Sequence, residues 1–167
     1  HPSISGVASI TVSDRLFRTD LPSIGTAGVA PTAIAAGALA VNTHYTNAET
    51  AAKAYTIASA ADGKAGDWIT VTYTANIGNG NLHSYTVADT NYAPGSMIRV
   101  QPHDVTRIAV VDVSTTNDDI LKITGLTNGD GGIGTTIRFV NKTGTTDGWS
   151  VDAYVEGQAA CSAASAT

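Results

Sequence analysis

Alternation of apolar and polar residues is the clearest pattern along the chain. Between Ile69 and Ala75, apolar residues occupy every odd position and threonine occupies every even one. Between Trp149 and Glu156, apolar residues alternate again with more polar ones. Successive side chains of a β-strand point to opposite faces of the sheet, so each segment predicts a strand with one buried face.

Six further segments predict strands with weaker alternation: Ile4–Val12, His83–Val87, Met97–Val100, Thr106–Val113, Ile120–Thr124 and Thr135–Val140. Residue pairs that tolerate positive φ separate many of them: Asp62-Gly63, Asn79-Gly80, Asn128-Gly129, Asp130-Gly131 and Asp147-Gly148. From residue 97 onward, the strand spacing is typical of sandwiches and jelly rolls. We therefore expect an all-β fold, an antiparallel β-sandwich or jelly roll.

The segment Asn47–Ala54 has two interpretations. Thr46 and Glu49 have the spacing of a helix capping box, and Glu49 and Lys53 form a favourable i,i+4 pair. A short helix is one prediction, and a strand that continues into Tyr55–Ile57 is the other.

The N-terminal part of the chain has a different composition. A polar stretch at 13–20 precedes a segment rich in Gly, Ala and Pro. This composition predicts an extended N-terminal arm over 1–45, ahead of a β-sandwich domain over 46–158 and an Ala/Ser-rich tail over 159–167. The arm either lies across neighbouring subunits or packs on its own domain. If it crosses to a neighbour, its interaction residues are expected to be Ile24, Val29, Ala30, Pro31, Ile34, Leu39 and Val41.

Charge narrows the classes of partner. Charged residues make up 14% of the chain, against about 25% in an average soluble domain. The Lys and Arg residues are scattered and the net charge is −5, so we expect no nucleic-acid partner. Glycine and proline interrupt the apolar stretch Ser23–Val41, so we expect no membrane span. Low charge with many small polar residues suits a surface covered by neighbouring molecules.

Motifs for chemistry are weak. Cys161 is the single cysteine, which excludes an intrachain disulfide and a Cys-pair metal site. His103 and Asp104 are adjacent, and adjacent strand residues point to opposite faces, so they form a poor relay. Asn128–Gly132 is similar to the start of a calcium loop, but no carboxylate follows over 133–137, so a tight hairpin is favoured. We expect no catalytic residue, no metal and no cofactor, and hence a non-enzymatic protein.

Two alternatives involve copper and glycans. An N-terminal His1 can chelate copper with a second histidine, as in lytic polysaccharide monooxygenases. The available partners are His44, His83 and His103. Asn141-Lys142-Thr143 is a glycosylation sequon. A sugar-binding platform would draw on the aromatic residues Trp68, Tyr73, Tyr85, Tyr92, Trp149 and Tyr154, although core positions are favoured for them.

Two Thr- and Gly-rich stretches, Ala61–Tyr73 and Ile133–Val151, resemble segments of tailed-bacteriophage virion proteins. The resemblance implies a capsid decoration (cement) or head-fibre protein on the virion surface. Such a protein forms homo-oligomers, with a trimer favoured, and binds a major capsid protein. The alternatives are a subunit of an extracellular filament or phage fibre assembled by strand donation, and a carbohydrate-binding β-sandwich module.

Overall fold

The computed structural model describes residues 30–93, 97–101, 109–112, 119–125, 132–156 and 160–164. The chain divides into two compact units, His1–Ala30 and Pro31–Thr167. The fold presented below is that of the second unit. The predicted strand Ile4–Val12 and the arm residues Ile24 and Val29 lie outside the described residues.

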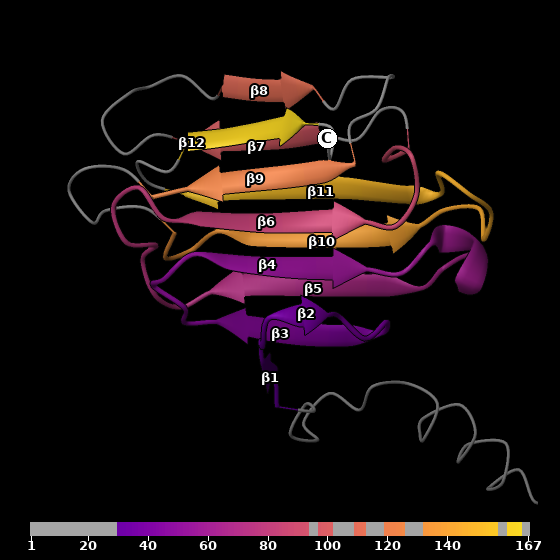
Figure 1. Cartoon of the computed structure of the whole chain (residues 1–167), viewed down its shortest axis with the longest axis horizontal. Coiled ribbons are helices and arrows are strands. Elements are labelled where there is room, and N and C mark those ends of the chain that lie inside the picture. The colour runs from indigo at the N-terminus through magenta and orange to yellow at the C-terminus, as the bar shows by residue number, and fades with distance from the viewer. Residues whose placement is uncertain are drawn as a thin grey trace, which may run out of the picture. The chain divides into compact units, whose positions relative to one another are not determined.

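The described residues form two β-sheets and one short 3-10 turn, η2 (Ala60–Asp62). The seven-stranded sheet has the order β1 (Thr32–Ala33), β3 (Thr43–Asn47), β5 (Trp68–Tyr73), β10 (Thr136–Asn141), β11 (Trp149–Glu156), β7 (Met97–Gln101) and β8 (Ala109–Asp112). The five-stranded sheet has the order β12 (Ala160–Ala164), β9 (Ile120–Thr124), β6 (Leu82–Val87), β4 (Lys53–Ile57) and β2 (Gly37–Ala38) (Figure 1). The prediction of an all-β fold is confirmed.

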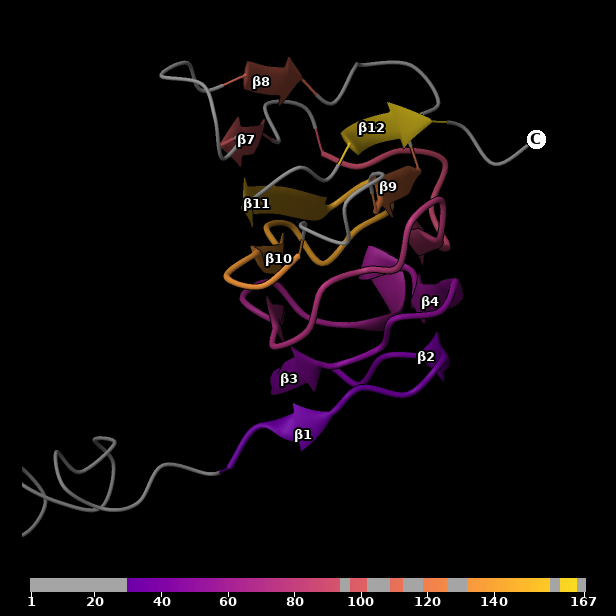
Figure 2. The same ribbon diagram turned by 90° about the vertical axis from the view of Figure 1, so that its left-hand side faces the viewer.

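The sheets are mixed, so the prediction of purely antiparallel pairing is wrong. Strands β1, β3 and β5 are parallel to one another in the larger sheet, and β2, β4 and β6 are parallel in the smaller one. From β1 to β6 the chain enters the other sheet after every strand, so it returns to each sheet in the same direction (Figure 2). Parallel neighbours need a long crossover, and here a strand of the opposite sheet supplies it.

The segment Asn47–Ala54 is not a helix, and only its ends are strand. Strand β3 ends at Asn47 and β4 begins at Lys53. The predicted ion pair of Glu49 with Lys53 is present at 3.4 Å, but Glu49 N donates to Asn47 Oδ1 at 3.0 Å, in place of the Thr46 side chain of the predicted capping box. Both ends of the segment belong to strands of different sheets, which leaves too few residues for a helix.

Both ends of the predicted domain extend further than expected. Residues 31–45, expected to be part of the arm, contribute β1, β2 and the first half of β3. Residues 160–164, expected to be part of the tail, form β12 and pair antiparallel with β9. The pattern missed them because their side chains are mostly alanine, glycine and serine, which carry little strand signal.

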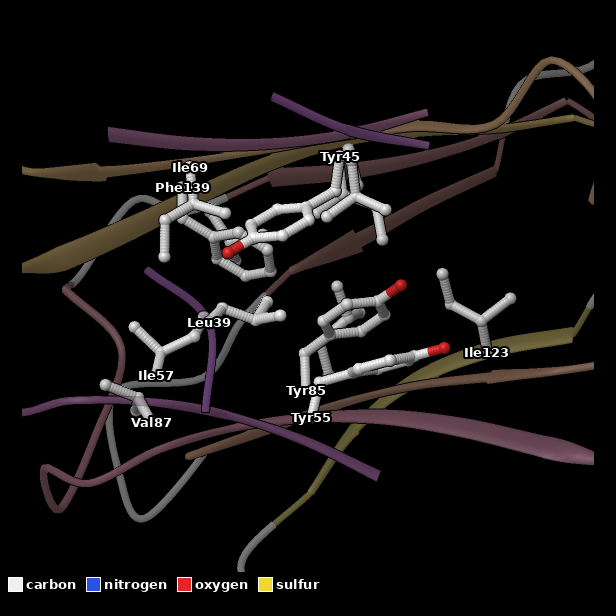
Figure 3. Packing of buried hydrophobic residues seen from close by; sticks show 14 of the residues in the cluster. Leu39, Tyr45, Tyr55, Ile57, Ile69, Tyr85, Val87, Ile123 and Phe139 are labelled. Atoms are coloured by element: carbon white, nitrogen blue, oxygen red, sulfur yellow. The ribbon is translucent and has the colours of Figure 1, made fainter. Parts of the chain in front are cut away.

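The core lies between the two sheets, and alternating positions of each strand point into it (Figure 3). In β5 and β6 every second residue is buried, from Ile69 to Tyr73 and from His83 to Val87. Tyr55 and Tyr85 are register partners on parallel strands, and their rings stack with centroids 4.8 Å apart. Burial of each such large side chain contributes about 1.5–3 kcal/mol to folding.

Candidate functional site

Residues 31–41 form a segment that we call the strap. Its strand β1 extends the larger sheet beside β3, and its strand β2 extends the smaller sheet beside β4. Two backbone bonds prolong this pairing: Ile34 N donates to Thr46 O at 2.9 Å, and Leu39 N donates to Thr56 O at 2.8 Å. The strap therefore forms an edge strand in each of the two sheets (Figure 2).

Two side chains anchor the strap in the core. Ile34 is 7% exposed and Leu39 is 6% exposed, and both belong to the main hydrophobic cluster. Three other predicted interaction residues are exposed, namely Ala30, Pro31 and Val41. The predicted interaction residues thus divide between anchors in the chain's own core and an exposed surface.

The strap ends at Asn42, which is fixed to the body of the molecule. Asn42 has a φ of 56°, and its backbone N–H donates to Trp68 O at 2.6 Å. Its side-chain amide donates to Asp67 Oδ1 at 2.9 Å and accepts from Trp68 N at 3.3 Å. Hydrogen bonds from the backbone of Lys64 and from Asn42 lower the pKa of Asp67. An ionised Asp67 therefore holds the point at which the strap ends.

A pocket of about 520 Å³ lies beside the end of the strap. Its apolar lining comes from Leu39 and Val41 of the strap together with Ala58 and Trp149. Trp149 is held in place because its Nε1 donates to Ala58 O at 2.9 Å. Polar residues of the β4–β5 connection complete the lining: Ser59, Asp62, Gly63, Lys64 and Asp67. The strap is thus in contact with protein on one side and borders open space on the other.

The outward positions of β4, β6 and β9 form a surface that we call the small-residue face. Its outward residues are Ala54, Thr56, Leu82, Ser84, Thr86, Ile120, Lys122 and Thr124. The register places them in rows across the three strands, for example Thr56, Thr86 and Ile120. Lys122 is the single charged side chain among these outward positions. The face therefore consists mostly of alanine, serine and threonine and carries one charge.

The outward side of the larger sheet carries charged side chains of both signs. One row across β3, β5, β10 and β11 contains His44, Thr70, Arg138 and Asp152. His44 Nε2 lies 3.0 Å from Thr72 Oγ1. The two faces of the molecule thus differ in charge although both are rich in threonine.

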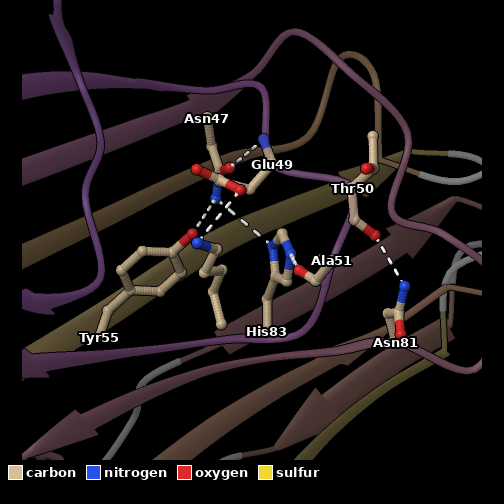
Figure 4. Close-up of polar contacts among 8 residues, drawn as sticks. Asn47, Glu49, Thr50, Ala51, Tyr55, Asn81 and His83 are labelled. Atoms are coloured by element: carbon tan, nitrogen blue, oxygen red, sulfur yellow. Dashed lines mark hydrogen bonds and ion pairs between the residues drawn. The ribbon is translucent and has the colours of Figure 1, made fainter.

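A buried polar cluster joins the two sheets. It consists of Asn47, Tyr55, Tyr73, His83 and Tyr85, each no more than 2% exposed. The Asn47 amide donates to the Tyr55 hydroxyl at 3.0 Å and to the Tyr85 hydroxyl at 3.2 Å. The Tyr73 hydroxyl lies 2.8 Å from that of Tyr85 and 3.0 Å from His83 Nδ1. Figure 4 shows Asn47 of β3 above Tyr55 and His83 of the opposite sheet.

The geometry fixes the protons of this cluster. His83 Nε2 lies 2.8 Å from Ala51 O, which can only accept, so Nε2 carries the hydrogen and Nδ1 accepts from Tyr73. Burial lowers the pKa of His83 and raises the pKa of Tyr55 to about 12. Burial also raises the pKa of Tyr85. The cluster is neutral and closed to solvent, so its role is to connect the sheets.

The connection between β3 and β4 covers this cluster. Besides the bond from His83 to Ala51, Thr50 O accepts from Asn81 Nδ2 at 2.9 Å and from Gly78 N at 2.8 Å (Figure 4). The cluster was missed at the level of sequence because its residues become neighbours only through the parallel registers of β3 with β5 and of β4 with β6, and through the packing of the two sheets. A polar Asn47 and a polar His83 at inward positions of strands were the available signal.

The structure describes only some of the residues that the sequence suggested as copper or calcium ligands. His83, a suggested copper partner, is buried and bonded within the cluster. His1, His103 and most of the calcium-like segment 128–132 lie outside the described residues. In the described part of the chain, no three His, Cys, Asp or Glu residues gather in a way that could hold a metal ion.

The glycosylation sequon lies on a buried asparagine. Asn141 is 0% exposed, its amide donates to Ala60 O at 2.8 Å, and its Oδ1 accepts from Gly144 N at 2.8 Å. Attachment of a glycan requires an accessible amide, so Asn141 supports the local turn instead.

The suggested aromatic platform is mostly core. Tyr73, Tyr85, Tyr92 and Trp149 are no more than 2% exposed. Tyr154 is 40% exposed and Trp68 is half-buried. These two lie at opposite ends of the strands on the larger sheet, since Tyr154 shares its row with Thr72 rather than with Trp68. They therefore do not form a continuous aromatic strip.

Comparison with known proteins gives no match to a family model, to a curated protein or to a solved structure. Within the described ranges, the chain has no helix of the length and apolarity needed to cross a bilayer. The described residues form an all-β arrangement of two mixed sheets.

Proposed function

We propose that this chain is a non-enzymatic structural subunit that assembles through its small-residue face, and that the assembly belongs to a virion shell as a capsid decoration protein. The finer fold class in this proposal is a β-sandwich. Two facing sheets support it, while the parallel pairs of β1 to β6 argue against a jelly roll, whose strands pair antiparallel.

The observation that carries the proposal is the composition of the small-residue face. Alanine, serine and threonine lose little side-chain entropy when a partner covers them, because they are short or fixed by β-branching. A face with Lys122 as its one charge requires little desolvation of ions on contact. The same properties make the face complementary to a second copy of itself, so a homo-oligomer is the expected assembly.

The sequence resemblance supplies the setting of a virion, and the face supplies the mode of contact. In this proposal the subunits pack by this face and hold a major capsid protein with their remaining surface. The more charged outward side of the larger sheet, with Arg138 and Asp152, suits that second and more specific contact.

Light scattering after size exclusion tests the proposal on the intact chain. Thr86→Arg places a long charged side chain in the centre of the small-residue face, and we expect it to weaken self-association at least tenfold. Thr72→Arg is the matched control, because Thr72 is also a half-buried outward threonine in mid-sheet, on the other face. A wild-type chain that stays monomeric, or equal weakening by both variants, contradicts assembly through this face.

A further inference from the structure

We infer that the strap, residues 31–41, exchanges between copies, so that in the assembled protein each chain's strap occupies the edge of a neighbouring chain. This inference rests on the proposed self-assembly and names the segment and the partner that carry it. The partner is a second copy of this chain.

The first argument is complementarity. The contacts of the strap with its own body define the site that it occupies. They are two apolar anchors, Ile34 and Leu39, and backbone hydrogen bonds to Thr46 and Thr56. An identical strap from a second copy satisfies the same site with the same contacts. Exchange of an identical element therefore costs little beyond the loss of freedom on association.

The second argument is the shape of the strap. Its two strands are two residues each, and they lie at the edges of two different sheets. An edge strand pairs on one side, so the strap detaches without breaking any bond between the strands of the body. Its sequence is rich in alanine and includes Gly37 with a φ of 106°, so it has little intrinsic preference for a strand.

The third argument is the boundary between the strap and the body. The backbone and side chain of Asn42 are bound to Trp68 and Asp67, so the direction of the chain is fixed at this residue, while the path of residues 31–41 depends on the strap site. The pocket of about 520 Å³ lies against Leu39 and Val41, just before this fixed point. Open space there gives the strap room to leave in a new direction with Asn42 as the pivot.

In such an exchange the strap of one copy binds the strap site of another, so the two copies contribute different surfaces to the contact. Such a contact forms a ring if the rotation closes and an open chain if it does not. The strap thus provides a second way of assembly that does not require the small-residue face.

Disulfide trapping in the intact chain tests the inference. Ala33 and Thr46 are register partners on β1 and β3; Ala33 is exposed, Thr46 is half-buried, and neither belongs to the small-residue face. In a Cys161→Ser background, Ala33→Cys with Thr46→Cys links the strap to whichever body it occupies. Oxidation of the assembled fraction followed by non-reducing denaturing electrophoresis then shows covalent dimers and higher multiples if straps are exchanged.

A second cysteine pair provides the control. Val140 and Ser150 are register partners on β10 and β11, within the body and outside the small-residue face, so Val140→Cys with Ser150→Cys must give one-chain products only. One-chain products from both pairs, in a fraction that light scattering shows to be oligomeric, overturn strap exchange and leave assembly by the small-residue face standing. Multimeric products from the strap pair that persist in Thr86→Arg support exchange and show that it does not require the small-residue face. A chain that is monomeric at every concentration overturns both.

Discussion

The strap and the central strands bury similar side chains but hold them in different ways. Ile69 in β5 is 0% exposed and lies in a strand paired on both sides, with β3 and with β10. Ile34 in the strap is 7% exposed, next to a two-residue strand paired on one side. The comparison suggests that the centre determines whether the chain folds, whereas the strap determines how one edge is closed.

The largest expected effect comes from a matched pair of substitutions. Ile69→Ala is expected to lower the free energy of unfolding by about 3–5 kcal/mol, because the surrounding strands cannot collapse into the cavity. Ile34→Ala is expected to cost about 1–2 kcal/mol, because the strap can open locally instead of unfolding the whole chain. Urea denaturation of both variants measures the difference.

Hydrogen exchange shows whether the smaller value has that cause. In the Ile34→Ala variant the amides of Ile34 and Leu39 are expected to exchange much faster, while amides of β5 and β10 keep their protection. Equal loss of protection in the strap and in β5 would mean that the two regions unfold together, and the comparison would then fail.

A second pair compares the buried polar cluster with the end of the strap. Asn47→Ala removes the donor from the hydroxyls of Tyr55 and Tyr85 in a closed site, and a buried unsatisfied group costs about 1–3 kcal/mol. We expect a loss near the top of that range, because the cluster also connects the sheets. Asn42→Gly removes exposed hydrogen bonds and keeps the positive φ, so its expected cost is below about 1 kcal/mol. Thermal unfolding of the two variants tests this order.

Strand positions could be predicted where one face is buried and the other polar. Strands β9 and β11 begin and end at the predicted residues, Ile120–Thr124 and Trp149–Glu156, and the second of these carries a clear two-residue period. Strand direction could not be predicted, because the period is the same for parallel and antiparallel neighbours. The mixed sheets follow from the path of the chain between sheets, and a local pattern contains no information about that path.

The candidate surfaces show the same limit. The sequence shows which residues of the arm are apolar, but whether Ile34 and Leu39 enter their own core depends on how the chain pairs with β3 and β4. The small-residue face appears only when the registers of β4, β6 and β9 are known, since no single strand is unusual. The buried cluster, likewise, gathers Asn47 and His83 from different sheets.

A third prediction concerns the dependence of stability on pH. The strap contains no titratable side chain between Pro31 and Val41, whereas the body contains the buried His83. Burial lowers the pKa of His83 below its ordinary value of 6.5. The unfolded chain therefore binds a proton that the folded chain does not, and stability is complete above about pH 6.5 and falls as the pH drops from there toward the folded pKa. The slope from this one group is at most about 1.4 kcal/mol per pH unit.

Denaturation at pH 7 and pH 5 in the wild type and in His83→Gln measures this dependence. Glutamine keeps a donor and an acceptor without a charge, so the variant is expected to lose part of the pH dependence. Asp67 does not interfere, since its lowered pKa places its own effect below about pH 3.8. An unchanged pH dependence in the variant would mean that His83 is not the group responsible.

The last effect is small and comes from Gly37→Ala, and it tests the comparison most directly. Gly37 has a φ of 106° and open space around the position of a Cβ, so alanine there costs backbone strain of about 1 kcal/mol without a clash. If the strap opens locally, no substitution in it can cost more than its free energy of opening, because the open form then becomes the ground state. Gly37→Ala combined with Ile34→Ala should therefore cost less than the sum of the two single variants.

Gly66 provides the control in the body. It has a φ of 96° with similar open space, and Gly66→Ala combined with Ile69→Ala should be additive, since both act on the body that unfolds as a whole. A double-mutant cycle that is additive in the strap as well would show that the strap and the body unfold in one step, and strap exchange would then require unfolding of the chain.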